Sequence, residues 1–272
     1  MDFCATNKAG KGTSLLLCAI CFALAGCGNV GHSPNQPVTL TVSAAISLKG
    51  PLQLIGQNYQ RTHPDQRVVC NFGASGTLQR QIEQGAPVDV FISAGERQMD
   101  ALEKEKLLVP GTRRDLLSNQ MALIEPARSQ KIKTFADLRQ RSVKTIAVGN
   151  PKIVPAGMYA QEVLEHLRLL PAIQHKLVYA ADVRQALAYV ETGNADAGLV
   201  YVTDAKITSA VRVAAIAPED SHLPILYPVA LLTSSKSPEA ARSFLDTLES
   251  PDSLAAFEKA GFGAANSQAA GN

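Results

Sequence analysis

The sequence has almost no excess charge and no block of residues of one sign. Its 272 residues include 26 Lys and Arg against 24 Asp and Glu, which gives a formal net charge of +2 at pH 7. Proteins that bind nucleic acid present a basic stripe or patch. The balanced charge therefore excludes nucleic acid as an expected partner.

Motifs of enzyme chemistry are also missing. The five histidines are scattered, and no pair has the spacing of metal ligands. No glycine-rich phosphate loop with a lysine is present, and Gly73-Ala74-Ser75-Gly76 is not the Gly-x-Ser-x-Gly turn of a hydrolase. We predict no catalytic residue, no cofactor and no bound metal cation. The alternative, an enzyme of phosphoryl or sulfuryl transfer, would need a general base and a cationic clamp.

The one long apolar run, Leu15 to Ala25, is too short to remain as a membrane-spanning helix. It follows Lys8 and Lys11 and ends in Leu24-Ala25-Gly26-Cys27, which resembles the lipobox of bacterial lipoproteins. We predict a signal peptide over 1–26, lipidation of Cys27 and a polar tether over 27–37. The alternative is an ordinary signal peptide with a chance cysteine. The lipobox implies a protein anchored to a membrane surface in the cell envelope, facing the periplasm.

Cysteine is scarce in the remaining chain. Cys4, Cys18 and Cys21 leave with the predicted signal peptide and Cys27 is lipidated, so Cys70 stands alone. No disulfide can form within the mature chain. We expect Cys70, in a predicted strand, to be a buried structural thiol rather than a reactive one.

Apolar residues make up 46% of the sequence, which is enough for a globular core, and the mature length suits two lobes. Strands and helices alternate, which predicts an α/β fold with open, mostly parallel sheets. We assign 38–121 plus 228–272 to the first lobe and 122–227 to the second. The predicted strands are 38–42, 67–72, 88–92, 145–148, 176–179, 197–202, 211–216 and 227–232, with a further one near 121–124.

Several predicted helices begin at loops of small residues or capping side chains. These loops contain Ser47, Gly73 to Thr77, Val154 to Gly157, and Ala181 to Val183. A helix N-terminus presents unpaired N–H groups and about half a positive charge. Several such ends aimed at one point would hold an anion without any Lys or Arg.

Ser47 and Ser75 follow neighbouring strands at their carboxyl ends, where ligands of open α/β sheets bind. Simple helix capping is the alternative role for both. Ala156 and Val183 can offer only a backbone N–H from the first turn of a helix, and Asp182 is placed as an N-cap. Tyr201 ends a strand, so its hydroxyl either reaches the cleft or lies in the core.

Longer segments resemble the molybdate-binding proteins of ABC importers. They include Ala44 to Leu48, Phe72 to Leu78, Gly85 to Ala94, Val148 to Pro151, Val154 to Ala160, Asp182 to Arg184, Gly198 to Tyr201 and Pro218 to His222. The resemblance implies the type II periplasmic-binding-protein fold, with a ligand cleft between two lobes. Two features of this sequence differ from the family pattern. The loop at Ala74 to Gly76 carries one serine where family members often have several, and the lipobox differs from members that are freely soluble in the periplasm.

The resemblance also implies the ligand and its contacts. Ser47 and Ser75 would donate to the ligand from the first lobe. From the second lobe, Ala156 and Val183 would donate through backbone N–H groups and Tyr201 through its hydroxyl. Ala94 would be a further donor. The ligand would be molybdate or tungstate, delivered by a monomer to an ABC permease. A site with donors alone suits an oxyanion that has only acceptors, since an unpaired buried donor costs about 1–3 kcal/mol. Sulfate has the same charge and acceptors, so a sulfate receptor remains the alternative.

Overall fold

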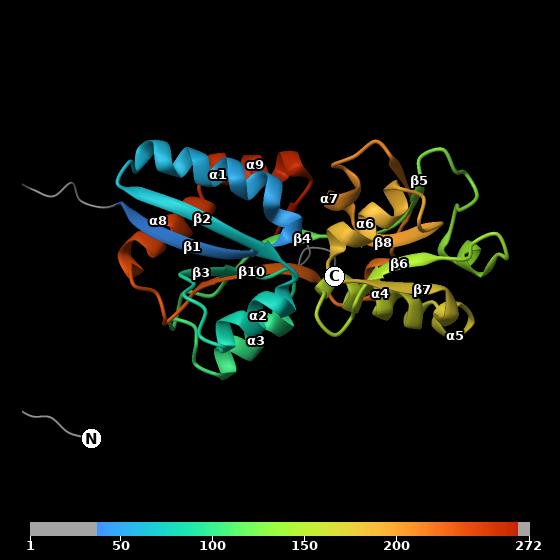
Figure 1. Cartoon of the computed structure of the whole chain (residues 1–272), viewed down its shortest axis with the longest axis horizontal. Helices are drawn as coiled ribbons and strands as arrows, with labels where there is room; N and C mark the ends of the chain where they lie inside the picture. The colour runs from blue at the N-terminus through green and yellow to red at the C-terminus, as the bar shows by residue number, and fades with distance from the viewer. Residues whose placement is uncertain (1–36, 266–272) are drawn as a thin grey trace, which may run out of the picture. The chain divides into compact units, whose positions relative to one another are not determined.

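The computed structural model describes residues 37–265, so the predicted signal peptide and Cys27 lie outside the described residues. The described chain folds into two α/β lobes, each built around one sheet (Figure 1). The first sheet has the strand order β11-β4-β10-β3-β1-β2, and the second has the order β7-β6-β8-β5-β9. Among residues 37–265, no helix has both the length and the apolar character needed to cross a membrane.

The first lobe combines elements from both ends of the described chain. Its strands are β1 (Val38–Ala45), β2 (Gln66–Gly73), β3 (Val90–Ile92), β4 (Arg114–Asn119), β10 (Ile225–Leu231) and β11 (Gly263–Ala264). Its helices are η1 (Ile46–Leu48), α1 (Lys49–Thr62), α2 (Ser75–Glu83), α3 (Glu96–Lys104), α8 (Pro238–Leu248) and α9 (Pro251–Ala260).

Successive side chains of β3 point to opposite faces of the sheet, and the first lobe has a hydrophobic cluster on each face. Val90 and Ile92 join the cluster that includes the buried face of α1, whereas Phe91 joins the cluster of α2 and α3. Helices α1 and α9 lie against one face and α2 and α3 against the other (Figure 1). The apolar spacing Leu52, Ile55 and Tyr59 on α1 therefore marks its buried stripe.

The second lobe is continuous in sequence. Its strands are β5 (Met121–Pro126), β6 (Ile146–Gly149), β7 (Leu177–Ala180), β8 (Ala197–Tyr201) and β9 (Val211–Ile216). Its helices are η2 (Phe135–Arg139), α4 (Pro155–His166), α5 (Leu170–Ile173), η3 (Gln174–Lys176), α6 (Val183–Glu191) and α7 (Val202–Ala205), with η4 (Glu219–Ser221) in the return connection.

Both sheets are mixed, which corrects the expectation of mostly parallel sheets. Strands β1, β2 and β3 are parallel to one another, and so are β6, β7 and β8, but β10 is antiparallel to both β3 and β4. β5 is likewise antiparallel to β8 and β9. The reason is the path of the chain. β5 and β10 enter their lobes at the crossings and run away from them, whereas their neighbours run towards them.

The crossings differ slightly from the expected boundaries. Met121 already pairs with β8 of the second sheet, and Ile225 already pairs with β4 of the first, ahead of the expected return at Pro228. Pro228 itself lies inside β10, where the pairing with β4 shifts register between Tyr227 and Pro228. A bulge tolerates proline because no ladder hydrogen bond is required from its missing N–H.

Two polar residues of the first lobe, Cys70 and Asp89, contribute to its structure. Cys70 is only half-buried, yet it packs against the main core, and burial raises the pKa of its thiol to about 11. Asp89 has a structural role: one carboxylate oxygen accepts from the Thr41 N–H at 2.7 Å and the other from the Ser235 hydroxyl at 2.6 Å.

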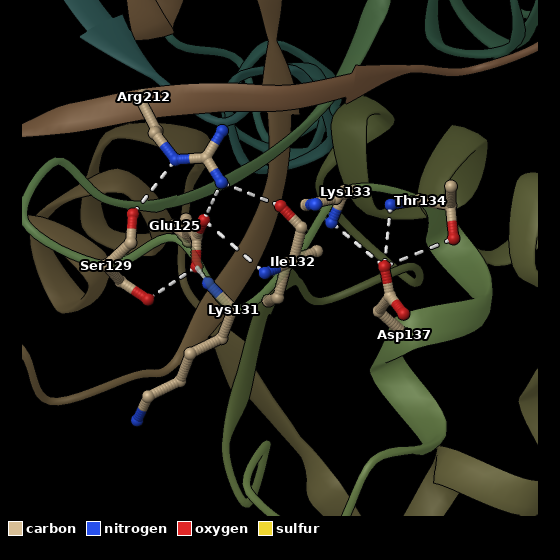
Figure 2. Close-up of polar contacts among 8 residues, drawn as sticks. All are labelled: Glu125, Ser129, Lys131, Ile132, Lys133, Thr134, Asp137 and Arg212. Carbon is tan, nitrogen blue, oxygen red and sulfur yellow. Dashed lines mark hydrogen bonds and ion pairs between the residues drawn. The ribbon is translucent and has the colours of Figure 1, made fainter.

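An ion pair with a buried carboxylate holds the loop after β5 of the second lobe. Glu125 of β5 is fully buried and is paired with Arg212 of β9 (Figure 2). The same carboxylate accepts from the Ser129 hydroxyl at 2.6 Å, and Arg212 donates to the Ile132 carbonyl at 2.7 Å. The pair thereby ties the loop after β5 to the sheet.

Candidate functional site

The five residues predicted as ligand contacts meet at one cavity between the lobes. Its walls come from the ends of β1, β2, β3 and β8 and from the starts of α2, α4 and α6. The space between them, including its opening to solvent, is about 210 Å³. The lining residues are Ala45, Ile46, Ser47, Gly73, Ala74, Ser75, Ala94, Val154, Pro155, Ala156, Val183 and Tyr201. Neither Lys nor Arg is among these residues.

The two serines do not act as helix caps. Ser47 lies in η1, and its Oγ lies 3.1 Å from the Tyr227 hydroxyl. Ser75 is the first residue of α2, whose N-cap is Ala74, and its Oγ accepts a hydrogen bond from the Ala94 N–H at 3.0 Å. Because Ser75 Oγ accepts that bond, its own proton is available to a group in the cavity. The Ala94 N–H, in contrast, is already engaged, which argues against the expected extra donor there.

Two helices of the second lobe begin at the cavity. Ala156 is the second residue of α4, after Pro155, and Val183 is the first residue of α6. Asp182 is the N-cap of α6 as predicted, with its carboxylate accepting from the Gln185 N–H at 2.9 Å. The N–H groups of a first helical turn have no carbonyl partner within the helix. Ala156 and Val183 can therefore offer such groups to a ligand.

Tyr201 lies fully buried at the end of β8, and its hydroxyl donates to the Ala94 carbonyl of the other lobe at 3.2 Å. Burial raises the pKa of Tyr201 well above its usual value, so the hydroxyl keeps its proton. A phenol has only one proton to donate. The Tyr201 hydroxyl can thus either hold the lobes together through its hydrogen bond to Ala94 or rotate and donate to a ligand.

The backbones of the two lobes touch beside the cavity. The N–H of Gly76 in α2 donates to the Ile153 carbonyl, before α4, at 3.0 Å. A Cβ at position 76 would lie 2.6 Å from that oxygen and 2.9 Å from the Ile153 Cα. Gly76 thus permits a close approach between its own backbone and the backbone of the opposite lobe.

Sequence reasoning gave no role to Arg184, which joins the lobes at the rim. Its Nη2 donates to the Ser47 carbonyl at 3.2 Å, and its Nε lies 2.8 Å from Oδ1 of Asp204 in an ion pair whose N–H is poorly aligned. Burial raises the pKa of Asp204 to about 6, against the opposing effect of Arg184. The guanidinium thus pairs with a carboxylate of its own lobe and does not line the cavity.

A second group that sequence reasoning missed lies behind Ser47. Asn119 at the end of β4, Thr203 of α7 and Tyr227 of β10 are buried and joined by hydrogen bonds. Only the assembled fold brings them together, because β4 and β10 are separated by the whole second lobe in sequence. The available signal was a run of polar residues, Ser118-Asn119-Gln120, directly before the crossing.

Fold and site together define a two-lobed binding protein whose cavity presents hydroxyl and N–H donors from both lobes. The chain belongs to the family of bacterial extracellular solute-binding proteins, whose model matches residues 40–263.

Three comparisons identify proteins similar to this chain. It is 38% identical over 242 residues to YvgL of Bacillus subtilis, named as an ABC transporter substrate-binding lipoprotein, covering 88% of this chain and 92% of that protein. It is 38% identical over 225 residues to the molybdate-binding protein ModA of Haemophilus influenzae, covering 81% and 88%. The periplasmic molybdate-binding protein of Azotobacter vinelandii superposes with a TM-score of 0.75 at 27% identity, covering 82% and 98%. The predicted two-lobed fold of periplasmic binding proteins is thereby confirmed.

Proposed function

We propose that this protein captures molybdate outside the cytoplasm and delivers it to the membrane permease of an ABC importer. The observation that carries the proposal is the cavity between the lobes, lined by Ser47, Ser75, Ala156, Val183 and Tyr201 and by no cationic side chain. Tungstate has nearly the same size and charge, so we expect it to bind as well.

The donor set matches a tetrahedral dianion that has only acceptors. Ser47 and Ser75 of the first lobe and Ala156 and Val183 of the second line the same space, where their hydroxyl and backbone N–H groups would donate. Tyr201 adds a donor when its proton turns from the Ala94 carbonyl. Hydrogen bonds to a charged group contribute about 1.5–3 kcal/mol each. The helix N-termini add favourable dipoles, so the anion needs no positive side chain.

Ligand binding and lobe closure are coupled in this proposal. The cavity is complete only while Gly76 contacts Ile153 and Tyr201 contacts Ala94 across the lobes. A ligand that bonds to both lobes favours the closed state over an open one. We propose that the permease recognises this closed state and that the protein performs no chemistry on the ligand.

The location follows from the N-terminal residues, which lie outside the described part of the chain. We propose that residues 1–26 are removed as a signal peptide and that Cys27 carries the lipid anchor. The name of the relative YvgL as a lipoprotein supports this assignment. We further propose that the protein works as a monomer, since the two lobes of a single chain supply all five of the contacts proposed for the anion.

Calorimetry on the mature chain tests the function and separates it from a sulfate receptor. Titration with molybdate should give one site of micromolar or tighter affinity, and sulfate should bind far more weakly because it is smaller. A sulfate affinity equal to or above that for molybdate would favour the receptor of another oxyanion. Hydrolysis or transfer of a phosphoryl or sulfuryl group by the protein would indicate the enzyme alternative.

A further inference from the structure

The Ser47 hydroxyl ends a chain of buried polar groups that starts at the crossing between the lobes. The side-chain amide nitrogen of Asn119 lies 3.1 Å from the Tyr227 hydroxyl, which in turn lies 3.1 Å from Ser47 Oγ. Ser47, Asn119 and Tyr227 are exposed by 2%, 4% and 0%. Because bulk water does not reach these groups, each donor and acceptor must be satisfied by the protein or by a ligand.

The donor-to-acceptor direction of these hydrogen bonds is fixed at Asn119. Its Oδ1 accepts from the N–H of Gln120 at 2.9 Å, so the amide group cannot be turned around without placing two donors against each other. The Nδ2 group therefore faces the other way. It donates one hydrogen to Thr203 Oγ1 at 2.9 Å and the other to the Tyr227 oxygen.

The proton of Tyr227 has one satisfactory direction as a result. An amide nitrogen of this kind accepts no hydrogen bond, so Tyr227 cannot donate back to Asn119. If Ser47 donated to Tyr227, the phenol would accept twice and leave its own buried proton without a partner. Burial also raises the pKa of Tyr227, so the hydroxyl stays protonated. Tyr227 therefore donates to Ser47 Oγ.

The Ser47 hydroxyl is then left with its own proton, and Ser47 lines the cavity. Within the described part of the chain, the Ser47 hydroxyl makes its hydrogen bond to Tyr227. The second serine of the cavity has the same polarity for a different reason, because the Ala94 N–H donates to Ser75 Oγ. Each serine oxygen thus already accepts one hydrogen bond, and each serine keeps its own proton to donate to a ligand.

We propose that Asn119 and Tyr227 are specificity-determining residues, which hold the Ser47 hydroxyl as a donor and thereby reject oxyanions that carry a proton. This inference rests on the proposed function, since it concerns the same cavity. Hydrogen arsenate is a tetrahedral dianion like molybdate, but one of its oxygens bears a proton that needs an acceptor. Tyr227 already occupies one of the two acceptor positions of Ser47 Oγ. Accepting the proton of hydrogen arsenate at the other position would turn the Ser47 proton away from the ligand and leave it unpaired.

Tyr227→Phe tests the chain at its central member. The substitution removes the hydrogen bond that orients the Ser47 hydroxyl, so the hydroxyl can rotate between donating to the ligand and accepting from it. We expect molybdate affinity to fall by about 3- to 10-fold, the effect of one lost hydrogen bond. Hydrogen arsenate should bind relatively better, so that the ratio of the two dissociation constants changes by about tenfold. Tyr59→Phe is the matched control, because it removes another buried phenol of the same lobe, bonded to Gln66 at 2.7 Å.

A second variant reverses the donor-to-acceptor direction of these hydrogen bonds instead of removing one of them. In Asn119→Asp the carboxylate accepts from Tyr227, so Ser47 must donate to the phenol and present an acceptor to the ligand. The added charge repels both dianions, so it cancels in the ratio of their dissociation constants. The ratio should therefore shift towards hydrogen arsenate at least as far as in Tyr227→Phe. In a Ser47→Ala background, Tyr227→Phe should no longer change the ratio, because the effect passes through Ser47.

The outcomes separate this inference from the proposed function. If the wild-type protein binds molybdate but both variants leave the ratio within twofold of wild type, the inference is overturned while the function stands. Equal weakening of both anions also overturns it, because that is the effect of a purely structural role. If the wild-type protein binds no molybdate, the proposed function fails and the inference fails with it.

Discussion

Gly76→Ala isolates the closure of the lobes from the stability of the fold. The added Cβ would lie 2.6 Å from the Ile153 carbonyl oxygen and 2.9 Å from its Cα, and both are backbone atoms that no rotamer change can move away. The residue is the second of α2, where alanine favours the helix over glycine by up to about 1 kcal/mol. We therefore expect a protein that folds normally but cannot bring the lobes together.

The expected loss of affinity follows from the donors that the second lobe contributes. Separation of the lobes withdraws the N–H groups of Ala156 and Val183 from an anion held by the first lobe. A hydrogen bond to a charged group contributes about 1.5–3 kcal/mol. Losing both costs about 3–6 kcal/mol, which corresponds to a dissociation constant weaker by about 100-fold or more.

Calorimetry with molybdate and thermal unfolding without ligand measure the two effects separately. Gly50→Ala is the matched control, because Gly50 is also the second residue of a helix and a Cβ there meets no atom within 4 Å. The control should bind as wild type does. Gly76→Ala should melt at or slightly above the wild-type temperature and show almost no molybdate heat. Binding within threefold of wild type would refute the role given to this contact.

Three further substitutions test other parts of the structure. Ser75→Leu fills the cavity and removes a donor, so calorimetry should detect no molybdate binding; retained micromolar affinity would count against the site. Burial raises the pKa of Asp204 from 3.8 to about 6, so its contribution to stability is present at low pH and is lost as pH rises through that window, by on the order of 3 kcal/mol. Urea unfolding of Asp204→Asn from about pH 4 to about pH 7 should lack this component, and an identical pH dependence would contradict it. Arg212→Leu leaves the buried Glu125 carboxylate without its charged partner, which should cost about 3–5 kcal/mol in urea unfolding and leave molybdate affinity unchanged.

The elements that sequence reasoning predicted are those with a strong local signal. The apolar spacing on α1, the buried run of β3 and the capping residue of α6 are visible without any tertiary information. The loops that enclose the cavity were also visible, because small residues follow each strand at its carboxyl end. These signals placed the candidate residues at strand ends and helix starts, and the resemblance to molybdate-binding proteins then implied that they share one site.

The remaining features depend on contacts between distant parts of the chain. Strand β4 has only the pair Leu116-Leu117 between polar ends, and it becomes a strand because β10 and β11 supply its neighbours. The sequence permits a close approach at Gly76 but does not identify Ile153 as the partner. The polarity of the serine hydroxyls is likewise set by Tyr227 and Ala94, whose positions only the folded chain defines.

Crystallography of the mature protein with tungstate would show directly whether the cavity between the lobes binds the anion, because tungsten scatters anomalously and can be located without a model of the ligand. We predict one strong anomalous peak per chain, within hydrogen-bond distance of the Ser47 and Ser75 hydroxyls and of the Ala156 and Val183 nitrogens. A peak bound instead by lysine or arginine at the surface, or a cavity left empty at saturating tungstate, would contradict it.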